Sequence, residues 1–223
     1  MIDHSLLHPA LTVEELEAGC RLALRYEVAS VCILPYYTER CAEILAGSGV
    51  KTSTTVGFPH GGHKTAIKLE EAKRALDDGA VEIDSVINIS KARSEDWAYI
   101  TDELLELTQL AHSRSGKIKV IFENAYLNDE QKIKLCAICG EIKADWVKTS
   151  TGFGPGGATL DDLKLMRHYS PSHVQVKAAG GVRDLETLLA IKGIGVTRVG
   201  ATRTAQMLEA WRKRISLAPL NVG

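Results

Sequence analysis

The chain has 223 residues, of which 45% are hydrophobic and 25% are charged, and its formal net charge is -1. This length suits one compact domain with a well-buried core, and the balanced charge gives no signal for binding nucleic acid or an acidic membrane. No apolar run approaches the ~20 residues of a membrane span, and the first residues lack the basic and apolar segments of a signal peptide. These features favour a cytoplasmic protein without a membrane segment.

Short β-favouring segments alternate with helical segments along the whole chain. Each strand is bounded by glycine, proline or a polar turn, as is typical of alternating α/β proteins. The last strands include two short runs that end near Lys148 and Lys177. The expected strands are residues 2–4, 29–34, 51–58, 81–87, 118–123, the two runs ending near Lys148 and Lys177, and residues 197–200.

Helix signals lie between these strands. The segments Thr12-Val13-Glu14-Glu15 and Asn128 to Gln131 have the spacing of capping boxes, so we expect helices to begin there, the first extending to about Tyr26. Ser94 is the expected cap of a long amphipathic helix. Further helices are expected from Thr38 to before Gly47, over residues 70–76 and 159–167, and around Met207, Leu208 and Trp211.

Eight strands joined by helices or turns predict a parallel sheet, and eight is the number that closes into a packed barrel. The periodicity by itself does not separate a closed barrel from an open doubly wound sheet. No linker or change of composition divides the chain, so residues 1–223 are expected to form a single domain.

Two lysines stand at the ends of neighbouring β-favouring runs. Lys148 follows Trp146-Val147 and Lys177 follows Val176, and each is followed by a glycine-rich loop. The carboxyl ends of barrel strands carry the chemistry of this architecture. Burial and a second ammonium nearby both favour a neutral amine, which is the nucleophile that forms a Schiff base with a carbonyl. The alternative is that either lysine points outward or makes a structural ion pair.

Asp84 lies in the otherwise apolar segment Val81 to Ile87 and strengthens the catalytic interpretation. Because side chains alternate along a strand, Ile83 and Asp84 face opposite sides, and a carboxylate inside a barrel needs a cationic or proton-transfer partner. The two lysines could supply that partner. Glu123 occupies a similar place one strand later, and its role, catalytic, structural or paired with a lysine, stays open at this stage.

These motifs closely resemble those of a known enzyme family. Val147 to Phe153 and Val176 to Arg183 resemble the two signature strands of deoxyribose-phosphate aldolases, which are class I aldolases built on a (β/α)8 barrel. The resemblance extends from the segment beginning Ile2-Asp3-His4 to the segment Val199 to Thr202. It implies an α/β fold of the (β/α)8 TIM barrel type and decides between the closed barrel and the open sheet.

The resemblance also implies residue roles. Lys148 would be the Schiff-base nucleophile, Lys177 would lower the pKa of Lys148 and assist proton transfer, and Asp84 would donate and accept protons. The implied reaction is reversible cleavage of 2-deoxy-D-ribose 5-phosphate to D-glyceraldehyde 3-phosphate and acetaldehyde, with no metal and no organic cofactor. This is an aldehyde-lyase reaction of deoxyribonucleotide and carbohydrate catabolism.

The substrate phosphate is expected at the loops after the seventh and eighth strands, where barrels often bind phosphate. Arg203 departs from the family, which often has a small hydroxyl residue there; a bidentate guanidinium would strengthen phosphate binding or shift substrate preference. Leu34 and His8 are two further departures at the mouth of the site. The expected phosphate-binding residues are Thr151, Gly180, Gly181, Gly200, Ala201, Thr202 and Arg203.

Three other motifs suggest different chemistry. Residues 152–157 fit G-x-G-x-x-G, but Lys177 stands in the region where a dinucleotide site needs an acidic residue. His60 and His63 could begin a metal site, although no third ligand at a fixed spacing supports it, and a surface loop is favoured. Cys136 and Cys139 form a C-x-x-C inside a helical pattern, which favours core packing over redox or metal use.

Two alternatives to this aldolase are a Schiff-base aldolase of another sugar phosphate and a catalytically silent barrel that binds a sugar phosphate. The chain begins almost at its first strand, so the floor of the barrel could be covered by residues 215–223 or by a neighbouring subunit. The expected partners are therefore the small sugar phosphate and further copies of the chain, in a homodimer or higher homo-oligomer, with no nucleic acid and no membrane.

Overall fold

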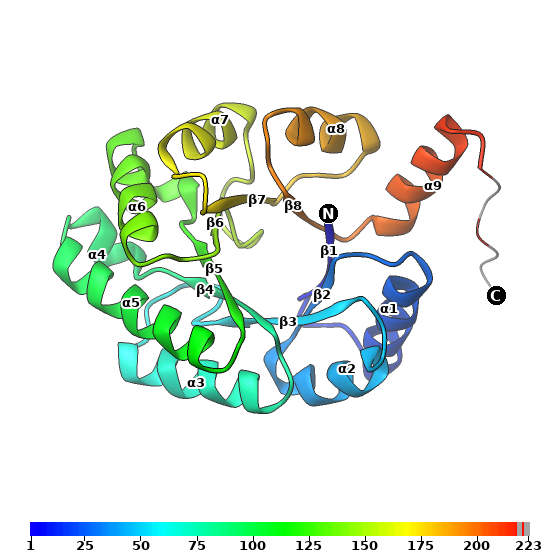
Figure 1. Ribbon diagram of the computed structural model, residues 1–223, viewed down its shortest axis with the longest axis horizontal. Coiled ribbons are helices and arrows are strands. Elements are labelled where there is room, and N and C mark those ends of the chain that lie inside the picture. The colour runs from blue at the N-terminus through cyan, green and yellow to red at the C-terminus, as the bar shows by residue number, and fades with distance from the viewer. Residues whose placement is uncertain (218–219, 221–223) are drawn as a thin grey trace.

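A computed structural model describes residues 1–217 and residue 220. Its eight strands are all parallel and form a closed barrel in which each strand pairs with the next and β8 pairs with β1 (Figure 1). The barrel predicted from the family resemblance is confirmed. The strands are β1 (Ile2–Leu6), β2 (Ser30–Ile33), β3 (Lys51–Val56), β4 (Glu82–Val86), β5 (Lys117–Ile121), β6 (Trp146–Lys148), β7 (Gln175–Ala179) and β8 (Arg198–Ala201).

The helices surround the barrel as an outer ring (Figure 1). Two short 3-10 turns, η1 (Pro35–Tyr37) and η2 (Asn124–Tyr126), follow β2 and β5. The α-helices are α1 (Val13–Arg25), α2 (Thr38–Leu45), α3 (Thr65–Asp77), α4 (Ile89–Arg93), α5 (Trp97–Ser113), α6 (Asp129–Glu141), α7 (Leu160–Tyr169), α8 (Leu185–Gly193) and α9 (Thr204–Arg214).

Both predicted capping boxes are present. At the start of α1 the Thr12 side chain accepts from the Glu15 amide, and the Glu15 carboxylate accepts from the Thr12 amide. Asn128 and Gln131 make the same reciprocal pair before α6. Reciprocal bonds satisfy amides that have no partner within the first helical turn, and this is why the sequence pattern located these two ends correctly.

Two helix boundaries differ from the prediction. The cap of α5 is Asp96, whose carboxylate accepts from the Tyr99 amide, whereas Ser94 ends the short unpredicted helix α4. The helix expected over residues 70–76 begins earlier, at Thr65. The Ser94 prediction was wrong because a serine can stand at the end of one helix as well as at the start of the next. Only the path of the backbone after Arg93 shows that Ser94 follows α4 and does not begin α5.

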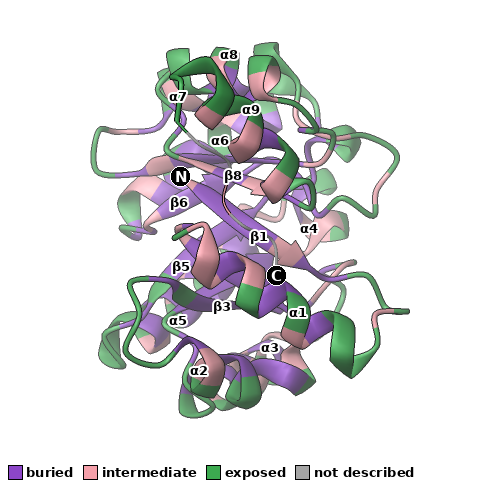
Figure 2. Ribbon diagram, turned by 90° about the vertical axis from the view of Figure 1, so that its right-hand side faces the viewer, coloured by how far each residue is buried: buried purple, intermediate pink, exposed green. Residues whose placement is uncertain are grey.

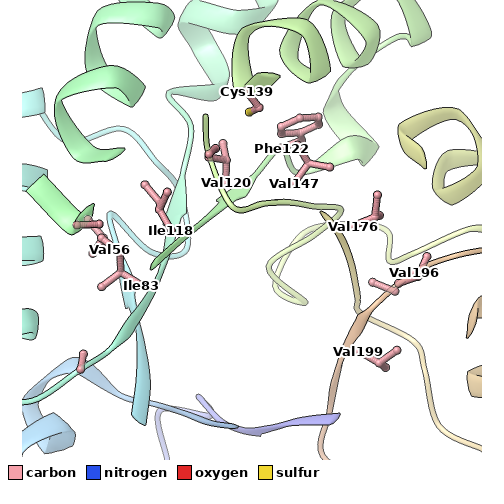
Figure 3. Packing of buried hydrophobic residues seen from close by; sticks show 14 of the residues in the cluster. Val56, Ile83, Ile118, Val120, Phe122, Cys139, Val147, Val176, Val196 and Val199 are labelled. Atoms are coloured by element: carbon pink, nitrogen blue, oxygen red, sulfur yellow. The ribbon is translucent and has the colours of Figure 1, made fainter. Parts of the chain in front are cut away.

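The hydrophobic core lies between the barrel and its helices. In Figure 3 the labelled apolar side chains of the strands, such as Val120 and Val147, lie on the outer side of the barrel wall, with Cys139 of α6 among them. Figure 2 shows the strands buried and the outer helix faces exposed. The outward positions thus take the apolar residues, which leaves the inward positions free for polar side chains.

No helix within the described residues is long and apolar enough to cross a membrane. Residues 218–219 and 221–223 lie outside the description, so the expectation that residues 215–223 cover the barrel floor falls largely on undescribed positions.

Candidate active site

Strand register brings polar side chains together inside the barrel. Lys148 of β6 pairs with Lys177 of β7, and Asp84 of β4 pairs with Lys119 of β5. All four residues are almost fully buried. Because the side chains of one strand alternate between its two faces, these residues point inward while their apolar neighbours face the helices.

Asp84 joins the two predicted catalytic lysines directly. Lys148 Nζ and Lys177 Nζ each donate to Asp84 Oδ2 at 2.7 Å. The structure thus brings together all three residues expected to be catalytic, and none of them points outward. The other carboxylate oxygen, Oδ1, accepts from Lys119 Nζ at 2.7 Å and from Ser53 Oγ at 3.3 Å.

More charged groups continue from Asp84 toward the amino ends of the strands. Lys177 Nζ lies 2.6 Å from Asp3 Oδ2, and Lys119 Nζ lies 2.6 Å from Glu82 Oε2. Arg198 contacts both of these carboxylates, with Nε 2.6 Å from Asp3 Oδ1 and Nη2 2.5 Å from Glu82 Oε2. We call these seven residues the interior network: Asp3, Glu82, Asp84, Lys119, Lys148, Lys177 and Arg198.

The network perturbs its members in different directions. Burial lowers the pKa of Lys148, and Lys177 lowers it further, against the opposing effect of Asp84. Burial would lower the pKa of Lys177 as well, but Asp3 and Asp84 together raise it above its usual value. Lys148 is thus the lysine favoured as a neutral nucleophile and Lys177 the one favoured as a cation. For Asp84, burial acts to raise the pKa, yet Lys119, Lys148 and Lys177 hold it well below its usual value.

A cavity of about 470 Å³ opens over these lysines at the carboxyl ends of the strands. Among its lining residues are Lys148, Lys177 and six of the seven residues expected to bind phosphate: Thr151, Gly180, Gly181, Gly200, Ala201 and Thr202. Arg203 is the exception. It is exposed, stands directly before α9 without a capping side-chain hydrogen bond, and does not line the cavity. Arg183 and His8 do line it and were not among the expected phosphate-binding residues.

Two glycines shape the loop after β7. Gly180 and Gly181 have φ angles of 82° and 86°, in the left-handed region that favours glycine. A Cβ on Gly180 would also lie 2.9 Å from Gly157 Cα. The loops after β6 and β7 therefore approach each other closely only because Gly157 and Gly180 lack side chains.

Glu123 makes no ion pair with Lys148 or Lys177. Its carboxylate accepts from both the amide and the hydroxyl group of Thr151, and Thr151 Oγ1 in turn accepts from the Phe153 amide at 3.0 Å. Thr151 and Phe153 both line the cavity, and the Phe153 ring lies edge-to-face against Phe58. Glu123 therefore connects the end of β5 to the loop after β6, and it is not paired with either lysine.

Four members of the interior network were missed by sequence reasoning. Lys119 stands between Ile118 and Val120, so the alternation argument used for Asp84 would have placed it inside the barrel too. Glu82 precedes Asp84 by two positions and shares its face. Asp3 and Arg198 had a weaker local signal, because each lies near the start of a short strand.

Two of the three competing motifs lie away from this site, whereas Gly152 and Phe153 of the glycine-rich segment 152–157 line the cavity. His60 and His63 are exposed, and Cys136 and Cys139 are buried in α6 as packing residues. Within the part of the chain that the structure describes, no group of three or more His, Cys, Asp or Glu residues is arranged to hold a metal ion.

Comparison with known proteins identifies the family of the chain. The profile of the DeoC/LacD family aldolases matches residues 1–200. The chain is 60% identical to a deoxyribose-phosphate aldolase of Rhodopirellula baltica over 222 residues, covering 100% of this chain and 92% of the relative. It is 45% identical to a deoxyribose-phosphate aldolase of Caldanaerobacter subterraneus, covering 96% and 93%. The structure of a tetrameric deoxyribose phosphate aldolase from Aeropyrum pernix superimposes with a TM-score of 0.88 at 29% identity, covering 96% and 90%.

Proposed function

Because the chain belongs to the DeoC/LacD family of aldolases, we propose that it reversibly cleaves 2-deoxy-D-ribose 5-phosphate to D-glyceraldehyde 3-phosphate and acetaldehyde. It is an aldehyde-lyase of the Schiff-base class. The observation that carries the proposal is the pair of 2.7 Å contacts that Asp84 Oδ2 makes with Lys148 and Lys177 below an open cavity.

In the proposed mechanism, the neutral Lys148 amine attacks the C1 aldehyde carbon of the open-chain sugar. The carbinolamine loses water to give an iminium ion, which withdraws electrons from the C2–C3 bond. Loss of the C3 hydroxyl proton then breaks this bond, releasing glyceraldehyde 3-phosphate and leaving an enamine on Lys148. Protonation at C2 and hydrolysis return acetaldehyde and the free amine.

Asp84 and Lys177 are assigned the proton transfers. Asp84 is within hydrogen-bond distance of the attacking nitrogen and of the Lys177 ammonium, so a proton can pass between the two lysines through one carboxylate. Lys177, whose pKa is raised by Asp3 and Asp84 despite burial, stays protonated, and we assign it the proton that leaves with the hydroxide of the carbinolamine. Its charge also disfavours protonation of Lys148.

The phosphate group is assigned to the loops after β7 and β8. Gly180, Gly181 and Gly200 offer backbone amides that a larger side chain would obstruct, and Thr202 offers a hydroxyl group. Arg183, at the cavity wall, adds a guanidinium. Arg203 is assigned no direct role in phosphate binding, since it does not line the cavity.

Reductive trapping tests the function. Incubation with 2-deoxyribose 5-phosphate and borohydride is expected to leave one ethyl group on the protein, because reduction captures the acetaldehyde iminium. Peptide mass spectrometry should place it on Lys148, and Lys148→Ala should abolish it. Lys117→Ala is the matched control, since it removes an exposed lysine at the start of β5. A folded wild-type protein that captures no aldehyde would contradict the mechanism.

We also propose that residues 1–223 form one aldolase domain that acts in the cytoplasm as a homodimer or higher homo-oligomer. The tetrameric relative from Aeropyrum pernix supports an oligomer. An apolar groove at the amino end of β1, lined by Leu188, Met207 and Trp211 among others, is a surface that a neighbouring subunit could cover.

A further inference from the structure

The interior network has an uneven charge. It contains three carboxylates, on Asp3, Glu82 and Asp84, and four basic side chains, on Lys119, Lys148, Lys177 and Arg198. If every group were ionised, one positive charge would be left without a partner inside the barrel. Burying an unpaired charge is costly, so the network favours the loss of one proton from one base.

The contacts decide which base loses that proton. Arg198 has two carboxylate partners, Asp3 and Glu82, and a guanidinium does not titrate in this range. Lys119 also contacts Glu82 and Asp84, and Lys177 contacts Asp3 and Asp84. Lys148 has Asp84 as its one carboxylate partner, and it shares that oxygen with Lys177. Lys148 is the base with the least compensation.

The other titratable groups near the network leave this count unchanged. Cys32 of β2 lies beside it, and burial raises the pKa of its thiol, so the thiol is neutral. Burial lowers the pKa of His4 to about 4, so His4 is neutral near pH 7. The amino group of Met1 interacts with Arg198 and Asp3 from the amino end, and its pKa is lowered, chiefly by burial. Its lowered pKa reduces the positive charge that it adds to the interior.

Trp146 packs against the network at the amino end of the barrel. Its ring is buried and lies 5.2 Å from the Arg198 guanidinium carbon and 5.8 Å from Lys119 Nζ. Trp146 Nε1 donates a hydrogen bond to Thr197 Oγ1 at 3.1 Å. Because the carboxylates and lysines of the network are buried, their charges interact through a low dielectric, and their sum affects Lys148 more strongly than it would in water.

We propose that Lys119, Glu82 and Arg198 act as positioning residues that set the total charge of the barrel interior and so keep the Lys148 amine unprotonated near neutral pH. They do this without touching the substrate, because all three lie on the side of Asp84 and Asp3 away from the cavity, and none of them lines it. The assignment of Lys148 as nucleophile rests on the proposed function, but the charge argument concerns the amine itself.

Charge-changing variants test this directly. Lys119→Met leaves three carboxylates against three bases, so Lys148 should hold its proton to higher pH. Glu82→Gln leaves two carboxylates against four bases, so Lys148 should lose its proton at lower pH. The double variant Lys119→Met, Glu82→Gln restores an excess of one base and should restore the wild-type behaviour. A shift of about one pH unit in opposite directions is expected for the two single variants.

The readout is competitive labelling of lysines with trace acetic anhydride, followed by peptide mass spectrometry of Lys148 acetylation across pH. Each curve is normalised to its own plateau, so the midpoint reports protonation and not access. Lys117→Met, an exposed lysine on the same strand as Lys119, should leave the midpoint unchanged. Circular dichroism confirms that each variant is folded, and the double variant, which removes both members of an ion pair, is expected to be the most stable of the three.

Opposite shifts that cancel in the double variant would support the proposal. Unchanged midpoints in the folded single variants, or shifts of both in the same direction, would overturn it. Loosened packing would shift the Lys148 midpoint in the same direction in both variants, whereas the two opposite charge changes shift it in opposite directions. The labelling needs no aldehyde. If the wild-type protein traps acetaldehyde but the Lys148 midpoint does not shift in the variants, this inference is wrong and the proposed function is unaffected. If the midpoints shift in opposite directions but the protein traps no aldehyde, the proposed function is wrong and this inference holds.

Discussion

At the scale of single residues, the wall of the cavity depends on side chains that do not themselves line it. Glu123 is the clearest case. It is buried, its backbone has a φ angle of 56°, and from the end of β5 it contacts the amide and the hydroxyl group of Thr151 in the loop after β6. A non-glycine residue in the left-handed region is uncommon and persists where surrounding contacts hold it. Here the contacts connect a strand end to the cavity wall.

Glu123→Ala should weaken substrate binding more than it slows the chemical steps. Removing a buried acceptor leaves the Thr151 amide without a partner, at a cost of ~1–3 kcal/mol, so KM should rise about tenfold while kcat changes less. Steady-state kinetics measures both. Glu123→Gln keeps one acceptor oxygen and should be milder, and the exposed Glu130→Gln is the control. A folded Glu123→Ala protein with wild-type KM would show that the loop does not depend on Glu123.

At the scale of elements, buried ion pairs join helices as well as strands. Lys68 of α3 donates to Glu103 Oε1 of α5 at 2.7 Å and to the Val86 carbonyl oxygen at 2.8 Å. Both side chains of the pair are fully buried. Thr65 and Tyr99 also contact the Glu103 carboxylate, so the lysine completes a polar cluster between the two helices.

Loss of one member of this pair should therefore destabilise the protein. Lys68→Met leaves an unpaired buried carboxylate, which costs about 3–5 kcal/mol, whereas the double variant Lys68→Met, Glu103→Leu should recover much of that loss. Urea unfolding measures the free energy of unfolding. Lys73→Ala removes a solvent-exposed pair with Asp77 on the same helix and should change stability little. A single variant as stable as the wild type would mean that water reaches Glu103.

At the scale of the whole molecule, the interior network makes the stability of the fold decrease at acidic pH. Although burial would raise the pKa of Asp3 and of Asp84, the neighbouring cations hold both below the usual value. A carboxyl group with a depressed pKa in the folded state stabilises the fold fully above its unfolded pKa of about 4, and this contribution is lost as the pH falls toward the folded value.

Stability should consequently fall with decreasing pH below about pH 4. Urea unfolding at a series of acidic pH values measures the slope, and Asp3→Asn, which removes one of these carboxylates, should reduce it. Asp161→Asn, at an exposed position in the first turn of α7, is the control. An identical slope in Asp3→Asn and wild-type protein would show that the interior carboxylates do not control acid unfolding.

Much of this molecule could be predicted from its sequence. The alternation of strands and helices, both capping boxes and the inward face of Asp84 follow from near neighbours in the chain, because hydrogen bonds of helix ends and side-chain alternation in strands are local properties. The motifs around Lys148 and Lys177 gave the nucleophile and its partner as hypotheses, and the strand register brings them together as expected.

What only the tertiary structure decided is how distant groups meet. Asp84 of β4 reaches across the barrel to β6 and β7, and Asp3 of β1 contacts Lys177 of β7 because β8 pairs with β1 to close the ring. The same closure places Arg198 among carboxylates and leaves Arg203 outside the cavity. No local pattern encodes these contacts, because barrel closure and the stagger of the strands determine which inward side chains lie in the same layer. The energy of a buried charge, in turn, depends on all of its neighbours together.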